Sequence, residues 1–301
     1  MKPIVQLRAG NATARLLPAA GGRISALRLA PHGDAGVDVL YPYPEDFFDP
    51  IRWGKGGIYP LLPYSNRIAN ARVQVEGLPV VLAAHPDAAP HTLHGNGHAQ
   101  PWTLVQSNEA SAVMTLDSPA SAAWPWRYSG HMRIELAQDR VTIEIGIRNT
   151  DTRIMPAGIG LHPYFRHRPA ALVGYRATRF WPTTAEFLPE APRPPTADEI
   201  YIPERHLPEG GLTHYVSGWD GTAQLDLPEG QRLRLHADSL FSHLVVHRPD
   251  NMAYLCLEPV SHVADAFNLA ALGVVGTGSR LLAPGDSMAG VLRIQLEGVK
   301  P

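Results

Sequence analysis

The chain has 301 residues, of which 45% are hydrophobic and 18% charged, so it can bury a large core and is predicted to be globular. A net charge of -2 without a block of Lys or Arg excludes nucleic acid and anionic membranes as expected partners. Cys256 is the only cysteine, which rules out an internal disulfide and fits a reducing cytoplasm. The first residues lack a signal-peptide core, and no apolar run has the length of a membrane span.

Short strands separated by turn residues are predicted along the chain. They share an apolar or alternating composition and cover residues 4–8, 14–17, 24–29, 103–105, 112–116, 131–136, 141–148, 233–235, 241–246 and 288–296. The segment 141–148 alternates strictly, which is typical of a half-buried strand. Because no long amphipathic helix accompanies these strands, the predicted fold is all-β, a large antiparallel β-sandwich.

A segment rich in Pro, Glu and Arg, residues 189–211, resembles a linker between domains. The strand pattern resumes after it without a change in composition. We therefore interpret it as a long surface loop, and we expect one domain that covers residues 1–301.

Two ionisable residues stand inside apolar runs and directly before a proline. His162 lies in Gly158-Ile159-Gly160-Leu161-His162-Pro163-Tyr164-Phe165, and Glu258 lies in Leu255-Cys256-Leu257-Glu258-Pro259. A residue before proline is held in extended geometry, so both should project from strands. A buried carboxylate is costly without a partner or a task, and burial raises its pKa towards the range useful for a base. Each residue could instead be structural, His162 as a hydrogen-bonded core histidine and Glu258 as a buried ion-pair member.

Three further stretches contain residues suited to binding a polar ligand. Arg67 lies in a Pro- and Asn-containing loop and could donate several hydrogen bonds, or pair with a surface carboxylate. His94 belongs to His91-Thr92-Leu93-His94-Gly95-Asn96-Gly97-His98, where the glycines argue against a helical metal site. Asp220 follows Trp219 in a Gly-rich turn that could hold a sugar, or could be an ordinary Asp-Gly turn.

Together these motifs resemble the aldose 1-epimerase (galactose mutarotase) family, and the resemblance covers most of the chain in the right order. It is carried by Asn66-Arg67-Ile68, Leu93-His94-Gly95, His162-Pro163-Tyr164-Phe165, Trp219-Asp220, Cys256-Leu257-Glu258-Pro259 and Asp265-Ala266-Phe267-Asn268. The context of His162 and the Pro259-Val260 pair differ from the best-known galactose mutarotases, so the chain resembles the broader branch of the family.

The resemblance implies a large antiparallel β-sandwich and a small-molecule sugar substrate. It implies that Glu258 is the general base, His162 the general acid, and His94, Arg67 and Asp220 the residues that hold the sugar. Proton transfers to and from one sugar need no metal and no other cofactor. We expect the acid and the base to face each other across a sugar-sized gap.

Two alternatives remain open at this stage. A carbohydrate-binding protein on the same fold could lack catalysis, since fold does not fix function. A mutarotase for sugar phosphates would need cations around its pocket, and Arg52, Lys55, Arg166 and Arg168 lie near motif residues in the sequence. The sequence does not identify the sugar or the oligomeric state.

Overall fold

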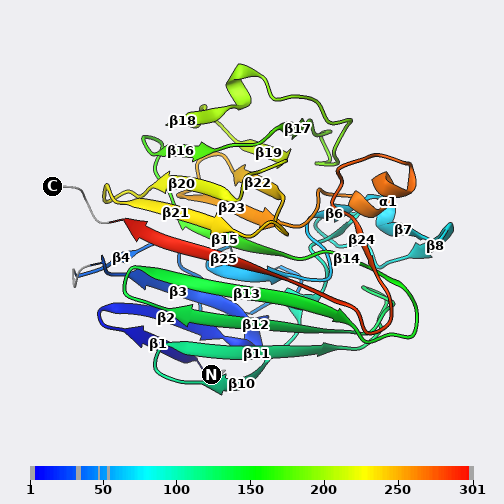
Figure 1. Ribbon diagram of the computed structural model, residues 1–301, viewed down its shortest axis with the longest axis horizontal. Coiled ribbons are helices and arrows are strands. Elements are labelled where there is room, and N and C mark those ends of the chain that lie inside the picture. Colours follow the sequence, from blue (N-terminus) through cyan, green and yellow to red (C-terminus); the bar gives the residue numbers. More distant parts are fainter. Residues whose placement is uncertain (1–3, 32–34, 47, 53–54, 298–301) are drawn as a thin grey trace.

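Two large antiparallel sheets stack face to face in the computed structural model, which describes residues 4–31, 35–46, 48–52 and 55–297 (Figure 1). The first sheet has ten strands, in the order β1 (Val5–Ala9), β2 (Ala12–Leu17), β3 (Arg23–Leu29), β5 (Ile58–Leu61), β15 (Gly160–Arg166), β23 (Tyr254–Val260), β22 (His243–Arg248), β19 (Leu212–Ser217) and β17 (Arg179–Trp181), with β4 (Val37–Asp38) beside β3. The second sheet has nine strands, in the order β10 (Thr103–Ser107), β11 (Ser111–Ser118), β12 (Tyr128–Leu136), β13 (Arg140–Asn149), β25 (Ser287–Glu297), β21 (Arg232–Ala237), β20 (Thr222–Asp226), β16 (Leu172–Tyr175) and β18 (Tyr201–His206).

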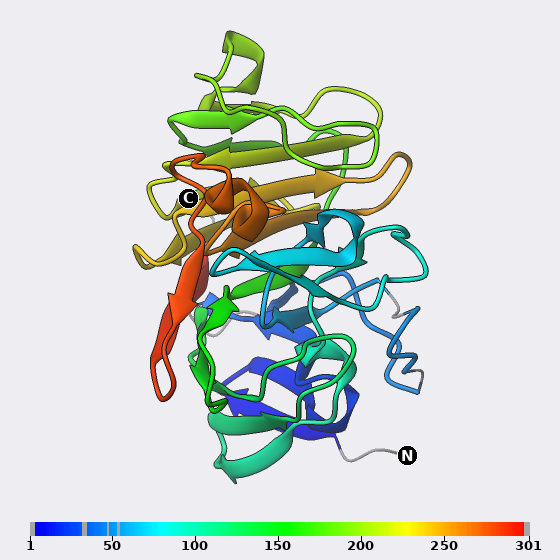
Figure 2. The same ribbon diagram turned by 90° about the vertical axis from the view of Figure 1, so that its right-hand side faces the viewer.

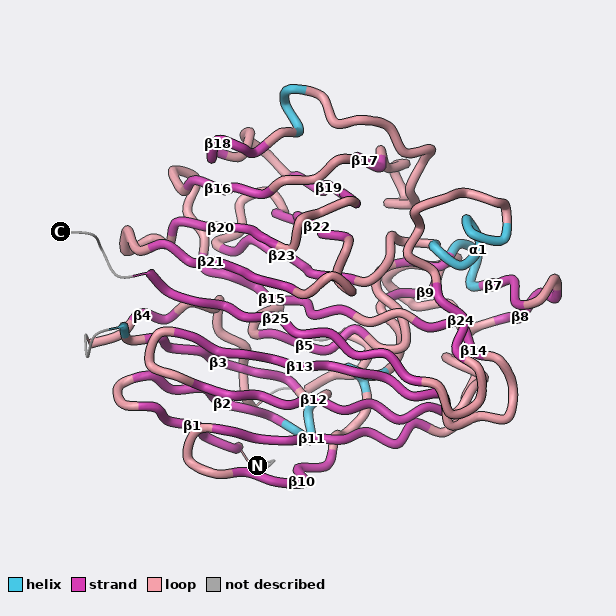
Figure 3. The backbone as a smooth tube through the Cα atoms, viewed as in Figure 1, coloured by secondary structure: helices cyan, strands magenta, loops and turns pink. Residues whose placement is uncertain are grey.

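Smaller elements gather at one end of the sandwich, on the right of Figure 1 and facing the viewer in Figure 2. They are the strand pairs β6 (Arg67–Ile68) with β9 (Thr92–Leu93), β7 (Arg72–Val75) with β8 (Leu78–Val81), and β14 (Met155–Ala157) with β24 (Arg280–Leu282), and the helix α1 (Ala266–Ala271). Single 3-10 turns occur at η1 (Pro18–Ala20), η3 (Ala69–Ala71), η4 (Gly97–Ala99) and η5 (Ala197–Glu199), so strands dominate the chain (Figure 3). No helix among the described residues is long and apolar enough to cross a bilayer.

The main core lies between the two sheets and follows from the alternation of side chains along each strand. In β13, Val141, Ile143 and Ile145 are buried and face this core, as the strict alternation predicted. In β23 every residue is buried, because both faces of this central strand are covered. Leu255 and Leu257 join the core between the sheets, and Tyr254, Cys256 and Glu258, which alternate with them, lie on the opposite face. Burial of both faces explains why the sequence of β23 is an apolar run with a carboxylate embedded in it.

The prediction of an all-β antiparallel sandwich is confirmed. The interpretation of residues 189–211 as a loop is wrong in part, because β18 pairs with β16 and completes the edge of the second sheet. Pro203 within β18 concealed this strand in the sequence, since proline is depleted in strands. An edge strand tolerates it, because only one side of an edge strand needs ladder hydrogen bonds.

The extent of the domain, residues 1–301, remains a prediction that proteolysis can test. The segment before β18 connects β17 in the first sheet with β18 in the second, and Glu190 in it is exposed. A glutamate-specific protease should cut there while the two fragments stay associated, because β18 and β17 are both paired within large sheets. Size-exclusion chromatography of the nicked protein measures this. Two fragments that separate and each remain folded would contradict a single domain.

Candidate active site

A cavity of about 250 Å³ opens on the face of the first sheet that points away from the second sheet. Its lining includes His162 and Glu258 from the central strands β15 and β23. It also includes His94 and Arg67, which follow and begin the short strands β9 and β6. Four of the five residues proposed from the sequence therefore meet in one place, although they are scattered over nearly 200 positions of the chain.

The register of the first sheet places the two central residues directly opposite each other. β15 and β23 are antiparallel, and the neighbouring pairs Gly160–Val260 and Tyr164–Cys256 fix the alignment. His162 and Glu258 lie midway between these pairs, so they are cross-strand neighbours on the same face. Each therefore owes its position to backbone hydrogen bonds in the middle of a ten-stranded sheet.

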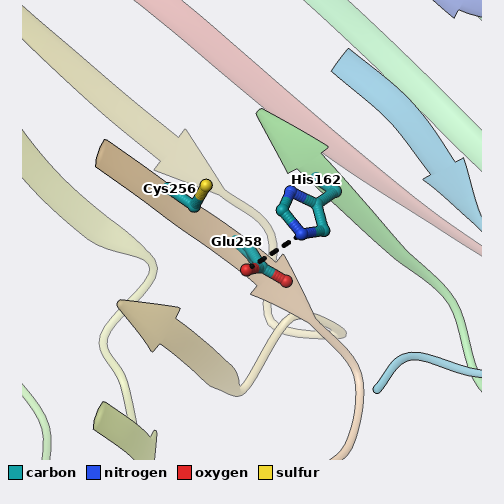
Figure 4. A group of neighbouring side chains, drawn as sticks. All are labelled: His162, Cys256 and Glu258. Carbon is teal, nitrogen blue, oxygen red and sulfur yellow. Dashed lines mark ion pairs between the residues drawn. The ribbon is translucent and has the colours of Figure 1, made fainter. Parts of the chain in front are cut away.

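The side chains of His162 and Glu258 are in direct contact (Figure 4). His162 Nε2 lies 3.3 Å from Glu258 Oε1, and both side chains are more than nine-tenths buried. The expected sugar-sized gap between them is wrong, because residues directly opposite on paired strands are only about 5 Å apart at Cβ. A sugar in the cavity must therefore contact both groups on the same side of its ring.

Each member of this pair has one polar atom without a hydrogen-bond partner among the described residues. These atoms are His162 Nδ1 and Glu258 Oε2, and both are buried. Buried polar atoms are nearly always hydrogen-bonded, so an unpartnered one needs an explanation. Two such atoms in one buried acid–base pair indicate a site that a polar ligand completes.

Burial shifts the two titrations in opposite directions. Burial raises the pKa of Glu258 well above its ordinary value, although the nearby Lys55 opposes this shift. The pKa of His162 is lowered well below its ordinary value, first by burial and then by cations that include Lys55. The two groups are close enough to titrate as a unit. A proton held by this pair can therefore be carried by either residue.

Two tyrosine rings hold the imidazole of His162 in place. Its ring stacks on Tyr164 with 4.6 Å between centroids, and on Tyr59 with 4.7 Å. On Tyr59, the guanidinium of the fully buried Arg23 lies 4.6 Å from the ring centroid. These contacts fix the orientation of the imidazole without occupying its nitrogens.

His94 reaches the cavity through a strained turn. Its φ of 60° and the φ of 66° at Gly95 are both in the left-handed region. A Cβ at Gly95 would lie 2.2 Å from the carbonyl oxygen of Leu62, so only glycine fits there. The His94 Nδ1 accepts a hydrogen bond from the backbone N–H of Asn66 at 3.0 Å, which fixes the ring close to His162, at 5.3 Å between centroids.

Asp220 does not belong to this site, and its expected role as a sugar ligand is wrong. It is exposed, and its Oδ1 accepts hydrogen bonds from the backbone N–H of Thr222 at 2.9 Å and from the Thr222 hydroxyl at 2.7 Å. Trp219 is buried and donates from Nε1 to the Thr222 carbonyl. The motif is thus the Asp-Gly turn that the sequence left open as an alternative.

The histidines at positions 91, 94 and 98 do not form a metal-ligand group among the described residues. His98 lies buried behind Tyr59, and His91 accepts a hydrogen bond from the backbone of Asn70. Among the described residues, the group with metal-ligand chemistry is instead His162, Cys256 and Glu258, whose ligand atoms lie within 4.8 Å of one another. Burial raises the pKa of the Cys256 thiol well above its ordinary value, which disfavours the thiolate that binds zinc.

We expect catalysis to be independent of metal, as predicted from the sequence, and we expect added Zn²⁺ to inhibit it. A zinc ion held by His162 and Glu258 would occupy both of the groups that are expected to transfer protons. The expected mutarotase activity should therefore be unchanged after treatment with a chelator and should fall on addition of Zn²⁺. Loss of exchange with chelator and recovery with zinc would contradict this prediction.

Several lining residues had no recognisable signal in the sequence. Tyr59 is paired with His162 across β5 and β15, and Tyr215 belongs to the same cross-strand row two strands beyond Glu258. Phe187 contacts Arg67, whose guanidinium carbon lies 4.8 Å from the ring centroid. Register between distant strands brings these residues together, and a single sequence does not display that register.

The comparisons with known proteins agree with this architecture. A family model described as aldose 1-epimerase matches residues 3–295 of the chain. The chain belongs to the aldose 1-epimerase family. Among curated proteins, this family member is 23% identical over 248 residues to the "Uncharacterized protein YphB" of Escherichia coli K12, a match that covers 79% of this chain and 83% of that protein.

Solved structures show that this member of the aldose 1-epimerase family has the fold of several relatives. A protein of Escherichia coli K12, named provisionally as an aldose 1-epimerase, superposes with a TM-score of 0.86 at 21% identity over 99% of both chains. The galactose 1-epimerase of Lactobacillus acidophilus superposes with a TM-score of 0.77 at 14% identity, over 98% of this chain and 94% of that one. At these identities the likeness establishes the fold, and the activity has to be argued from the site.

Proposed function

We propose that this protein is a mutarotase, which interconverts the α and β anomers of an aldose by opening and closing the sugar ring. The observation that carries the proposal is the contact between His162 and Glu258 in the cavity, where each has a buried polar atom without a partner. Family membership supports it as well. We also propose a cytoplasmic location, on the cysteine content alone.

The geometry of the pair fits the atoms that must exchange protons. In a cyclic aldose, the anomeric hydroxyl and the ring oxygen are bonded to the same carbon. A base and an acid that serve these two oxygens must therefore be neighbours, and His162 and Glu258 are neighbours at 3.3 Å. Contact between the two groups suits this reaction better than the wide separation expected from the sequence.

The proposed reaction moves one proton in each direction. Glu258 takes the proton of the anomeric hydroxyl while His162 gives its proton to the ring oxygen, and the C1–O5 bond breaks to leave an aldehyde. Rotation about C1–C2 exposes the other face of the carbonyl. The ring then closes with the roles reversed, so each group acts once as acid and once as base.

Ring opening in this direction requires that His162, and not Glu258, carries the shared proton. Ring opening as written starts with the shared proton on His162, whereas burial alone favours the proton on Glu258. The two arrangements contain the same number of protons, so they interconvert without exchange with solvent. His94 and Arg67 complete the proposal as residues that hold the sugar.

Anomer exchange measured by NMR tests this proposal directly. Saturation of the α-anomer H1 signal should transfer to the β-anomer faster with enzyme than in buffer of the same composition. Glucose, galactose and their 6-phosphates form a first panel. Binding of these sugars without any acceleration would contradict the mutarotase proposal and favour the alternative of a non-catalytic carbohydrate-binding protein.

A further inference from the structure

The charges that line the cavity are unbalanced. Lys55 and Arg67 both contribute to its lining, and Glu258 is the single carboxylate there among the described residues. That carboxylate is already in contact with His162. The chain as a whole has a net charge of -2, so the positive cavity is a local feature that opposes the overall charge.

Two further carboxylates, Glu186 and Asp87, do not restore the balance of charge in the cavity lining. Glu186 lies 3.5 Å from His91 Nε2, and 65% of its side chain is exposed. Asp87 acts electrostatically on Lys55 and is itself exposed. Neither Glu186 nor Asp87 belongs to the cavity lining.

The position of the two cations differs from that of the acid–base pair. Lys55 is exposed and Arg67 is half-buried, whereas His162 and Glu258 are buried in the central strands. Lys55 and Arg67 therefore lie towards the mouth of the cavity. A sugar whose C1 reaches the pair would extend its far end towards them.

We propose that the substrate is an aldose with a negatively charged substituent on a carbon remote from C1, held at the cavity mouth by Lys55 and Arg67. This inference rests on the proposed mutarotase function and narrows it to acidic sugars. Phosphate and carboxylate groups share the necessary chemistry, since both accept charge-assisted hydrogen bonds from an ammonium and a guanidinium group.

The titration of the cavity histidines agrees with a positive field. The pKa of His247, which also lines the cavity, is lowered to about 4 by burial and then by Lys55 and Arg67. The pKa of His94 is lowered by burial first, and the same two cations contribute. An anionic substituent would be attracted by this field more strongly than the hydroxyl groups of a neutral sugar.

The first experiment compares matched sugars in the NMR exchange assay. Glucose is compared with glucose 6-phosphate and glucuronate, and galactose with galactose 6-phosphate and galacturonate. We expect kcat/KM to be at least roughly tenfold higher for the better acidic sugar than for its neutral parent, as one or two charge-assisted hydrogen bonds would give. The advantage should shrink as salt is added. The phosphate and uronate substrates show which acidic group the site prefers. A kcat/KM for both acidic sugars that is equal to or lower than that of the neutral parent would overturn the inference.

Variants show whether Lys55 and Arg67 cause the preference. Lys55→Gln and Arg67→Ala should each lower the ratio of acidic to neutral kcat/KM, with Arg67→Ala acting mainly through KM. Arg133→Gln removes an exposed positive charge from β12 in the second sheet and should leave the ratio unchanged. A ratio that survives in Lys55→Gln and Arg67→Ala would overturn the assignment. Because Lys55 is exposed, its variant keeps the test valid if Arg67→Ala does not fold.

A binding measurement separates failure of this inference from failure of the mutarotase proposal. 1,5-Anhydroglucitol lacks the anomeric hydroxyl and cannot mutarotate, so calorimetry with it and with its 6-phosphate measures recognition alone. Tighter binding of the 6-phosphate, weakened by Lys55→Gln, supports the inference even if no sugar is turned over. Equal binding of the two compounds contradicts the inference even if neutral sugars are turned over rapidly.

Discussion

Acidification from about pH 6.5 to about pH 4 is expected to remove most of the stability of the folded protein. Burial lowers the pKa of His98 to about 3, and it lowers the pKa values of His243 and His262 to about 4. Each of these rings is at least 96% buried, and none can be protonated without bringing a charge into the interior. The unfolded chain protonates the same histidines near pH 6.5.

The contacts of His262 show why the folded state resists its protonation. Its Nδ1–H donates to the carbonyl of Val263 at 2.7 Å, and its Nε2 accepts from the backbone N–H of Ser65 at 3.1 Å. A proton on Nε2 would leave two N–H groups facing each other. The ring also fills the space beside Gly158, where a Cβ would lie 1.9 Å from a ring carbon, so it has no room to turn away.

The sign and size of the effect follow from proton linkage. A histidine with a lowered folded-state pKa contributes stability that is present above pH 6.5 and is lost as the pH falls towards the folded-state value. Each such group removes about 1.4 kcal/mol per pH unit in that window, so His98, His243 and His262 together remove about 4 kcal/mol per unit. Most domains have only about 5–15 kcal/mol. The raised pKa values of Glu258 and Asp265 have the opposite sign, but these two groups are fewer than the three histidines.

Tryptophan fluorescence and far-UV circular dichroism between pH 8 and pH 3.5 measure this transition. The buried Trp124 and Trp126 report on the core between the sheets. His262→Gln should reduce the loss of unfolding free energy by about 1.4 kcal/mol per pH unit, which is the contribution of one buried histidine. His236→Gln changes an exposed ring and should leave the loss per pH unit unchanged. A protein whose free energy of unfolding stays constant between pH 6.5 and pH 4 would contradict the assignment.

Replacement of Glu258 by glutamine is expected to lower kcat by roughly 10²–10⁴-fold, the usual contribution of one proton-transfer group. The amide keeps the size of the side chain but cannot take a proton from the anomeric hydroxyl. His162→Asn should have a similar effect. Because each proton transfer in the proposed reaction needs both groups, the losses should not multiply in the double variant.

The matched control is Asp220→Asn, which also converts a carboxylate to an amide but lies outside the cavity. Its kcat and KM should equal those of the unaltered protein, provided that circular dichroism shows an intact fold in every variant. Turnover close to normal in folded Glu258→Gln would eliminate the mechanism. Loss of turnover in Asp220→Asn would show that the site extends beyond the cavity described above.

The fold and the centre of the site could be predicted because both leave marks in short stretches of sequence. Alternation along residues 141–148 identified a strand with one face in the core. His162 and Glu258 were recognisable because an ionisable residue inside an apolar run has few explanations. Both precede a proline, and both lie in strands, as that restriction on the backbone predicts.

The contacts within the site could not be predicted, because they join residues on strands that are far apart in the sequence. The contact between His162 and Glu258 follows from the register of β15 with β23, which is decided by pairing across about 100 residues of chain. Tyr59 enters the site through the same kind of relation. Asp220 was misassigned because a carboxylate in a glycine turn can serve either the turn or a ligand, and its hydrogen bonds to Thr222 serve the turn.

The cross-strand row that contains the proposed catalytic pair limits how proteins with this fold can diverge. The spacing of His162 and Glu258 is set by ladder hydrogen bonds in the middle of a sheet, and a one-residue insertion in β15 or β23 would turn one of them into the core. Lys55 and Phe187 lie on connecting segments, where insertions are tolerated. Selection for a new sugar can therefore change the rim of the cavity freely while the reaction chemistry stays the same. A library designed to alter substrate preference should vary these connecting segments and leave the central strands untouched.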